Sequence, residues 1–541
     1  MNLPFILDIG IGLFSIYLTL SLFASELQEL MTTVLQWRAQ HLKQSIETLL
    51  AGESKPIPNQ TAAEIQIVRS QIVHSKELAN QLYKHPLIRS LDHESKGLIG
   101  RIAEQVSQWT NTAKIFSGKA SGPSYLPSDV FSVALLETLK TGEVAQTLSE
   151  QKLKKFVDGT LINSVVEIIN FLRHGAANES LLDRELQMFQ AEVHGLMQAF
   201  SNRQTPLTDS FNQIASAVKR FLLASEAVLP DHDSQSHVFL KQLAAIEQEI
   251  PSLLKQVDPS IVEVMSELNN MAWVVESFQT AKGDYQTIVE QLPDKTLQKR
   301  FQAGYDLIHV VNQTVKDSSQ GQDSFQTTLT HLVPNLRDSL TMLAKQAQQK
   351  IETPDQGANQ LQKEVALWFD RSMDRSAGVY KRNAKGVAII IGLLIAVITN
   401  TDTLHIINQL AQDSTLRDAY SQVASELVSR NPSAIVCLQA EQGEAAQVDC
   451  LNNEMMALHN TINSITNVPI GWNASNWRQQ WQSQPEGAWL GSLKILGGWL
   501  VSAIAISMGA PFWFNLLNKV INVRNSGKPP ASTSQTQSSS S

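Results

Sequence analysis

Three apolar stretches constrain the fold of this chain more than any other feature of its sequence. They are Pro4–Phe23, Gly386–Thr399 and Leu493–Phe514, and each is a candidate for a membrane span. The middle stretch holds only fourteen uncharged residues, fewer than the about 20 that a helix needs to cross the hydrocarbon layer. It spans if Lys385 snorkels to one headgroup layer; a buried core helix is the alternative. The sequence predicts a mainly α fold with three transmembrane helices and a large helical insert between the first and the second.

The first stretch has the features of an uncleaved anchor rather than of a signal peptide. A cleavable signal begins with basic residues and ends at a small-x-small site. Met1–Leu7 carries no Lys or Arg, Asp8 is acidic, and the run continues into the helix-forming sequence Glu26–Leu30. Asp8 is so close to the N-terminus that we expect it at the headgroup level rather than in a functional site within the bilayer.

Basic residues beside the spans indicate the orientation, because Lys and Arg near span ends stay on the cytoplasmic side. None precedes the first span, whereas Arg38 and Lys43 follow it. A dense basic cluster precedes the second span and consists of Arg371, Arg375, Lys381, Arg382 and Lys385. The segment 401–487 carries nine carboxylates and only three arginines. We therefore expect a protein of the inner (plasma) membrane with its N-terminus outside, the insert in the cytoplasm, 401–488 outside and the C-terminus inside.

These arguments divide the chain into consecutive parts. They are a first transmembrane helix (1–23), a helical cytoplasmic domain (24–385) that can be subdivided near 118–127 and 230–237, a second transmembrane helix (386–400), an extracytoplasmic loop (401–488), a third transmembrane helix (493–514), an interfacial amphipathic helix (515–524) and a tail (525–541). The tail is rich in Ser and Gln, a composition typical of disordered ends.

Helical periodicity and abundant Leu, Ala, Gln, Glu and Lys predict that the insert is mostly α-helical. Glu26–Leu50 keeps apolar residues at a spacing of three to four and is followed by the helix breakers Gly52, Pro56 and Pro58. Further helix candidates are Thr61–Tyr83, Ser128–Leu139, Phe156–Arg173, Ser180–Asn202, Phe211–Ala227, Val238–Ile250, Ser260–Gln279, Tyr285–Leu292, Leu297–Val315 and Ser324–Ile351. The tertiary fold of 141–351 does not follow from these patterns.

Composition and motifs favour no catalytic, cofactor or metal site. A net charge of −8 argues against a nucleic-acid partner. The sequence has no Walker-type loop, no strand–GxGxxG–helix unit, no GxSxG elbow and no HExxH motif. His232 and His237, with neighbouring aspartates, resemble an ordinary polar loop more than a metal site. We expect a protein that is not an enzyme; an enzyme hidden in the helical insert stays as an alternative.

The two cysteines, Cys437 and Cys450, both fall in the acidic segment between the second and third spans. In an oxidising compartment they can form a disulfide, and closing a loop of that length stabilises a fold by about 3 kcal/mol. Two unpaired thiols are the alternative.

The spans and their flanks carry signals for packing and for the membrane interface. Glycine and alanine in the spans, such as Gly392 and Gly498, favour close helix packing or self-association. No charged residue occupies the middle of a span, which argues against an ion pathway within one subunit. After the third span, aromatic and basic residues predict anchors at the membrane interface, namely Phe512, Trp513, Phe514, Lys519 and Arg524.

A juxtamembrane stretch before the second span mixes aromatic residues with paired Asp and Arg. Its candidate coupling residues are Trp368, Asp370, Arg371, Asp374, Arg375 and Tyr380. Asp370 and Asp374 alternate with arginines, as on a salt-bridged helix surface. A docking or coupling element and a plain anchored helix with a basic collar fit this stretch equally well.

Four stretches resemble a widespread family of uncharacterised bacterial integral membrane proteins. They are Phe14–Ser21, the pair Leu82–Ile88 and Pro123–Pro127, the run Trp368–Arg375 with the following GxYKR and NTDTL, and the final GAPFWF segment from Gly509 to Lys519. They cover about a quarter of the chain. The resemblance implies the three-span layout and supplies no activity; Asn515 stands where Asp is frequent in that family.

The leading expectation is a membrane-anchored helical scaffold, sensor or interaction protein, with the lipid bilayer and a protein partner or a second copy as its partners. An oligomeric channel or membrane-remodelling assembly is the alternative, because a pore needs several subunits when no single span carries charge.

Overall fold

The computed structural model describes residues 3–34, 37–52, 62–91, 123–230, 233–281, 283–318, 325–352, 356–429, 469–482 and 488–526. Throughout these ranges the regular structure is helical and no strand occurs, which confirms the predicted mainly α fold. The chain divides into two compact units. Unit 1 comprises Met1–Trp37 with Ala377–Ser541, and unit 2 comprises Arg38–Ser376.

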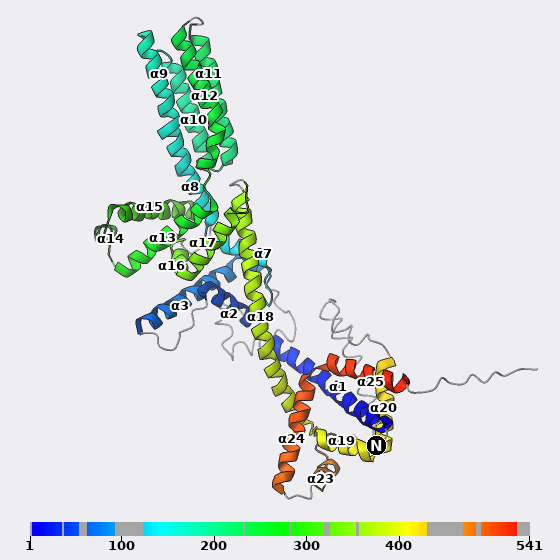
Figure 1. Ribbon diagram of the computed structural model, residues 1–541. Coiled ribbons are helices and arrows are strands. Elements are labelled where there is room, and N and C mark those ends of the chain that lie inside the picture. The colour runs from blue at the N-terminus through cyan, green and yellow to red at the C-terminus, as the bar shows by residue number, and fades with distance from the viewer. Residues whose placement is uncertain are drawn as a thin grey trace, which may run out of the picture. The chain divides into compact units, whose positions relative to one another are not determined.

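Unit 1 contains the apolar helices (Figure 1). Its elements are α1 (Leu3–Val34), the C-terminal part of α18 (Gly357–Ile398), α19 (Thr403–Gln412), α20 (Ser414–Ser429), α23 (Ala474–Gln482), α24 (Ala488–Ser507) and α25 (Ala510–Ser526). Helices α1 and α24 are long and apolar enough to cross a membrane. Helices α18 and α19 pass the same test together as a pair bent by 52°, so up to three spans fit the described residues.

Helix α1 is surrounded by neighbours that come from the end of the chain: α19, α20, α24 and α25 all pack against it. Leu410 of α19 approaches Gly12 so closely that an added Cβ there would lie 3.0 Å from the leucine side chain. Gly509, with φ +84°, occupies the left-handed region at the turn between α24 and α25. The segment predicted as an extracytoplasmic loop therefore includes two helices that belong to the apolar core of unit 1.

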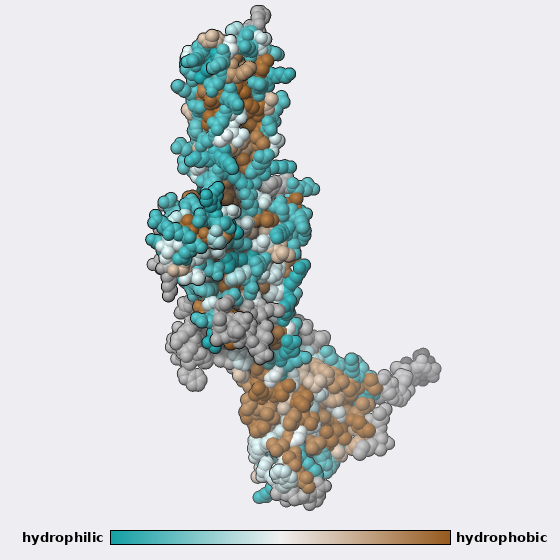
Figure 2. Space-filling model, turned by 60° about the vertical axis from the view of Figure 1, so that its left-hand side comes forward, coloured by the Kyte–Doolittle hydropathy of each residue, from teal (hydrophilic) through white to brown (hydrophobic). Residues whose placement is uncertain are grey.

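The surface of unit 1 differs in character from that of unit 2. In Figure 2 hydrophobic residues form a broad band on unit 1, whereas the surface of unit 2 is mostly hydrophilic. On unit 1, α18 exposes Ile389, Ile390 and Leu393, and α24 exposes Leu496 and Leu500. Contiguous apolar surface of this kind is what a lipid environment requires and a soluble protein avoids.

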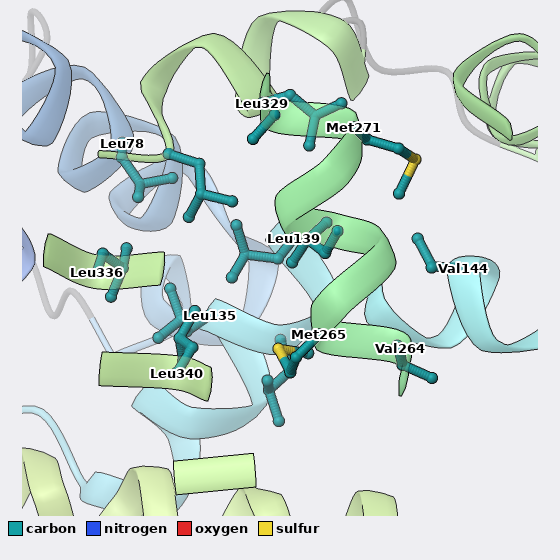
Figure 3. Packing of buried hydrophobic residues seen from close by; sticks show 14 of the residues in the cluster. Leu78, Leu135, Leu139, Val144, Val264, Met265, Met271, Leu329, Leu336 and Leu340 are labelled. Carbon is teal, nitrogen blue, oxygen red and sulfur yellow. The ribbon is translucent and has the colours of Figure 1, made fainter. Parts of the chain in front are cut away.

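Unit 2 is built from helices around two hydrophobic cores. Its elements are α2 (Trp37–Ala51), α3 (Ala62–Lys84), α4 (Pro86–Arg89), α7 (Ser128–Thr138), α8 (Thr141–Phe156), the π-helix η1 (Val157–Leu161), α9 (Ile162–Ala176), α10 (Asp183–Ser201), α11 (Leu207–Val228), α12 (Ser234–Val257), α13 (Ile261–Ala281), α14 (Tyr285–Gln291), α15 (Lys295–Ser318), α16 (Phe325–His331), α17 (Pro334–Gln348) and the first part of α18. One core draws on α3, α7, α8, α13, α16 and α17 (Figure 3). The other lies inside the bundle of α9–α12.

Most helices of unit 2 start and stop where local sequence dictates. Asp233 caps α12 by accepting hydrogen bonds from the amides of Gln235 and Ser236. Helices α11 and α12, on either side of this predicted boundary, contribute side chains to one and the same core. The single helix expected over Ser324–Ile351 is instead two, because Pro334 begins a new helix after the extended Val333.

Candidate functional site

The most unusual feature of unit 1 is a set of polar residues buried where α18 stops and α19 begins. We call the segment Thr399–Thr403 the polar break. Asn400, Thr401 and Asp402 are at most 2% exposed. Asn400 has φ +44°, a left-handed conformation that asparagine tolerates better than most residues. Buried polar groups destabilise a fold unless they find hydrogen-bond partners, so the partners of this segment decide what it does.

The carbonyl groups at the end of α18 are capped by a distant segment. The indole Nε1 of Trp472 donates to the carbonyl oxygens of Val397 and Ile398, at 2.9 and 3.0 Å. The amide of Gly471 donates to the carbonyl of Thr399 at 2.7 Å. These bonds satisfy groups that every helix end leaves open, and in an apolar surrounding each open group would cost several kcal/mol.

The first turn of α19 is capped by Asp402. Its Oδ1 accepts from the amides of Leu404 at 2.9 Å and His405 at 3.4 Å, and its Oδ2 accepts from Nε2 of Gln480 at 2.9 Å. Three donors and the first turn of the helix face the two oxygens of this side chain. Both oxygens thus find partners within the chain itself, although they lie inside an apolar unit.

Hydroxyl groups connect the polar break to two neighbouring helices. Oγ of Thr403 lies 2.6 Å from the Tyr17 hydroxyl of α1 and 2.7 Å from Oγ of Ser502 of α24. Thr403 also donates to the carbonyl of Gly498 at 3.2 Å. A single threonine at the start of α19 therefore links three helices, and such a shared network fixes their register.

A chain of amide side chains closes the site on the side of α23. Nδ2 of Asn400 donates to Oε1 of Gln480 at 3.2 Å, and Trp499 donates to Oδ1 of Asn400 at 3.2 Å. Nε2 of His405 lies 2.8 Å from Oδ1 of Asn476, an acceptor oxygen, so Nε2 carries a proton and donates it to the asparagine. Within the described ranges, Nδ1 of His405 has no hydrogen-bond partner.

Two glycines of the neighbouring helices leave room for these contacts. A Cβ on Gly498 would lie 1.7 Å from Oδ1 of Asp402, and a Cβ on Gly392 would lie 2.5 Å from the carbonyl oxygen of Ala503. The adjacent Gly497 has no such neighbour within 4 Å. Close backbone approach at small residues is the usual device for packing helices in lipid.

The predicted coupling residues do not come together in one site. Trp368 packs against the first core of unit 2, next to Phe369, whose ring stacks on Phe131 with centroids 4.2 Å apart. The charged residues of the stretch, Asp370, Arg371, Asp374 and Arg375, lie on the exposed surface of α18, and Tyr380 is half-buried. The stretch is a surface-charged helix with an aromatic contact to the core.

The predicted interface anchors behave differently from one another. Phe512 and Lys519 are exposed and Phe514 is half-buried. Trp513 is buried: its ring lies 4.8 Å from that of Tyr17, and its Nε1 donates to the carbonyl of Ala505 at 2.7 Å. Arg524 pairs with Asp8 and donates to Ser421. Helix α25 is therefore a packing partner of α1, and its assignment as a helix at the membrane interface stays a prediction.

The remaining predictions concern cysteines and metals. Cys437 and Cys450, and with them the predicted disulfide, lie outside the described residues. Across the ranges that the structure describes, no group of three or more His, Cys, Asp or Glu side chains is placed to hold a metal ion.

The polar break is a site that sequence reasoning missed. Asn400 and Thr401 directly follow the short apolar run of the second predicted span. Two features of the sequence could have indicated this site. One is the cluster of polar residues at the end of a predicted span that is too short, and the other is Trp472 in the segment that follows. The polar break holds neighbouring helices together, because nearly every polar group described in it already has a hydrogen-bond partner within the chain.

Comparison with known proteins adds no functional assignment: no protein-family model, curated protein or solved structure matches the chain.

Proposed function

We propose that this protein is a membrane-anchored helical scaffold or interaction protein, in which unit 1 is the anchor and unit 2 the part that meets partners in the cytoplasm. The observation that supports this most is the continuity of α18. This one helix of 42 residues carries Val365 and Phe369 into the core of unit 2 and, further along, presents Ile389 and Leu393 on the apolar surface of unit 1.

The polar break supports an anchoring role for unit 1. A site for transport or catalysis keeps groups free for its substrate, whereas here the side chains of Asp402, Asn400 and Thr403 are all engaged by the chain itself. The proposed placement of unit 2 in the cytoplasm of a bacterial inner membrane protein rests on the basic residues that precede the second span and on the resemblance of four stretches to bacterial membrane proteins.

The discontinuous helix pair favours one alternative. Broken spans occur in transporters, where the N-terminus of a half-helix faces an anionic group of the substrate; here the carboxyl group of Asp402 lies at the first turn of α19. Under this alternative several copies would pool their spans around a pore, and the protein would be an oligomeric channel or membrane-remodelling assembly.

Two measurements on the full chain distinguish these proposals. Membranes holding the protein are washed with alkaline carbonate, and intact cells are labelled with a membrane-impermeant maleimide before and after reduction. Retention in the membrane with cysteine labelling from outside supports an anchor with a cytoplasmic unit 2; labelling only after permeabilisation overturns that orientation. Purified protein is then reconstituted into liposomes: ion conductance would replace the scaffold with the channel.

A further inference from the structure

The search for a binding surface leads to the basic residues of α18 that belong to unit 1. Lys381, Arg382 and Lys385 are exposed, and the structure gives them no ion pair or hydrogen bond with any residue it describes. At 3.6 residues per turn these three positions fall within about 100° of the helix circumference. Three cations therefore share one face of the helix.

Apolar, exposed residues continue the same face toward the end of α18. Ile389 follows Lys385 by one turn, and Leu393 follows Ile389 by another; they are 44% and 42% exposed. An acyl chain alongside Ile389 and Leu393 would bring its headgroup to the level of Lys385, Arg382 and Lys381. The face thus offers apolar contact and positive charge in the order in which a phospholipid presents its tails and its phosphate.

The backbone is unusually open at this level. Among the residues that the structure describes, no atom lies within 4 Å of a Cβ added at Gly378 or Gly386, so no described side chain packs against α18 at these two positions, which flank Lys381, Arg382 and Lys385. Acidic side chains are absent from the helix between Asp374 and its end at Ile398, so this part of α18 offers an anion no competing carboxylate.

We propose that Lys381, Arg382 and Lys385 form a binding site for the phosphate headgroups of anionic phospholipids. The inference rests on the proposed function, because it requires unit 1 to lie in a bilayer. The site selects among lipids by charge: a zwitterionic lipid such as phosphatidylcholine presents the same phosphate with a compensating cation, whereas phosphatidylglycerol keeps a net negative charge. Each basic residue near an anionic surface strengthens the attraction by about fivefold.

The test measures which lipids stay bound. The full chain is reconstituted into vesicles of equal parts phosphatidylglycerol and phosphatidylcholine, released into mild detergent, and analysed by native mass spectrometry. We expect phosphatidylglycerol to be retained in excess, and the triple variant K381Q/R382Q/K385Q to lower this excess at least about tenfold. The matched control K154Q/K155Q, which removes two exposed lysines of α8, should keep it.

Each other outcome has a definite meaning. An equal excess of phosphatidylglycerol on the triple variant and on the wild type overturns the site. Retention of both lipids in equal amounts, by a chain that resists carbonate extraction, also overturns it and leaves the membrane anchor standing. A wild-type chain that carbonate removes from the vesicles contradicts the proposed function itself.

Discussion

Nε of Arg524, near the end of α25, lies 3.3 Å from Oδ1 of Asp8 in the first turns of α1. The contact is an ion pair without the alignment of a hydrogen bond. Opposite faces of a membrane are about 30 Å apart, so a protein with this contact cannot have Asp8 outside and Arg524 inside. The orientation expected from flanking charges conflicts with the structure at its C-terminal end.

We therefore predict that both ends of the chain are accessible from the same face of the membrane. Epitope tags at the N- and C-termini of the full chain should show the same protease sensitivity in sealed vesicles, and both should become equally sensitive when the vesicles are inverted. Opposite sensitivities would mean that α25 does not return along α1.

Gly498→Ala should destabilise unit 1, because the new Cβ would lie 1.7 Å from Oδ1 of Asp402 and the helix or the carboxylate must move. We expect a loss of about 1–3 kcal/mol, the range typical of overpacking in a filled core. Thermal unfolding of the purified chain in detergent measures it. Gly497→Ala, in the neighbouring position with open space, is the control and should be neutral or slightly stabilising.

Replacing Asp402 separates its role as a cap from its role as a charge. Asp402→Ala leaves the amides of Leu404 and His405 and the amide side chain of Gln480 without their acceptor. Unsatisfied buried donors cost about 1–3 kcal/mol, and loss of the cap adds about 1 kcal/mol. Asp402→Asn keeps an acceptor oxygen and should lose less. Thermal unfolding measures the stability of each protein. Equal stability of the wild type and Asp402→Ala would contradict the capping role.

Unit 2 should lose stability in acid through Glu364. Its carboxylate lies 2.7 Å from Nζ of Lys350, and this hydrogen bond, aided by Gln360, holds the pKa of the Glu364 carboxyl below its ordinary value. A carboxyl whose folded pKa is depressed stabilises the fold above its unfolded pKa of about 4.3, and that stabilisation disappears as pH falls through the folded value. Lys350→Met should therefore weaken the fold at pH 7 and flatten the decline of stability below about pH 4.3. The measurement is urea unfolding at a series of pH values. If the stability of the two proteins declined in parallel with pH, the role of Glu364 would be refuted.

Periodic patterns in the sequence predicted the helices of unit 2 well, and contacts over long separations explain what was missed. The helix over Ser260–Gln279 is present as α13 because its apolar spacing matches one buried face. Helix α8, by contrast, has a weak apolar pattern and is packed between the two cores. No local signal in the sequence predicts that this helix packs between the two cores.

The polar break and α25 show the same limit within unit 1. The charge pattern of Asn515–Arg524 suits a membrane surface, but Trp513, Leu517 and Ile521 also form one buried stripe, and only the position of α1 decides between them. The partners of Thr403 are Tyr17 and Ser502, which come from opposite ends of the chain. Such pairings depend on the folded arrangement and leave no trace in local sequence.

The cap on α18 has a consequence for how the protein is made. The carbonyl of Ile398 accepts a hydrogen bond from the indole of Trp472, which is synthesised 74 residues later in the chain. At about 5–20 residues per second, the ribosome needs about 4–15 s to supply it. During that interval the carbonyl groups at the end of α18 lack the indole donor, so water, the insertion machinery or a chaperone must satisfy them. The end of α18 therefore reaches its final hydrogen-bonded state late, and a chain truncated before Trp472 should not reach it.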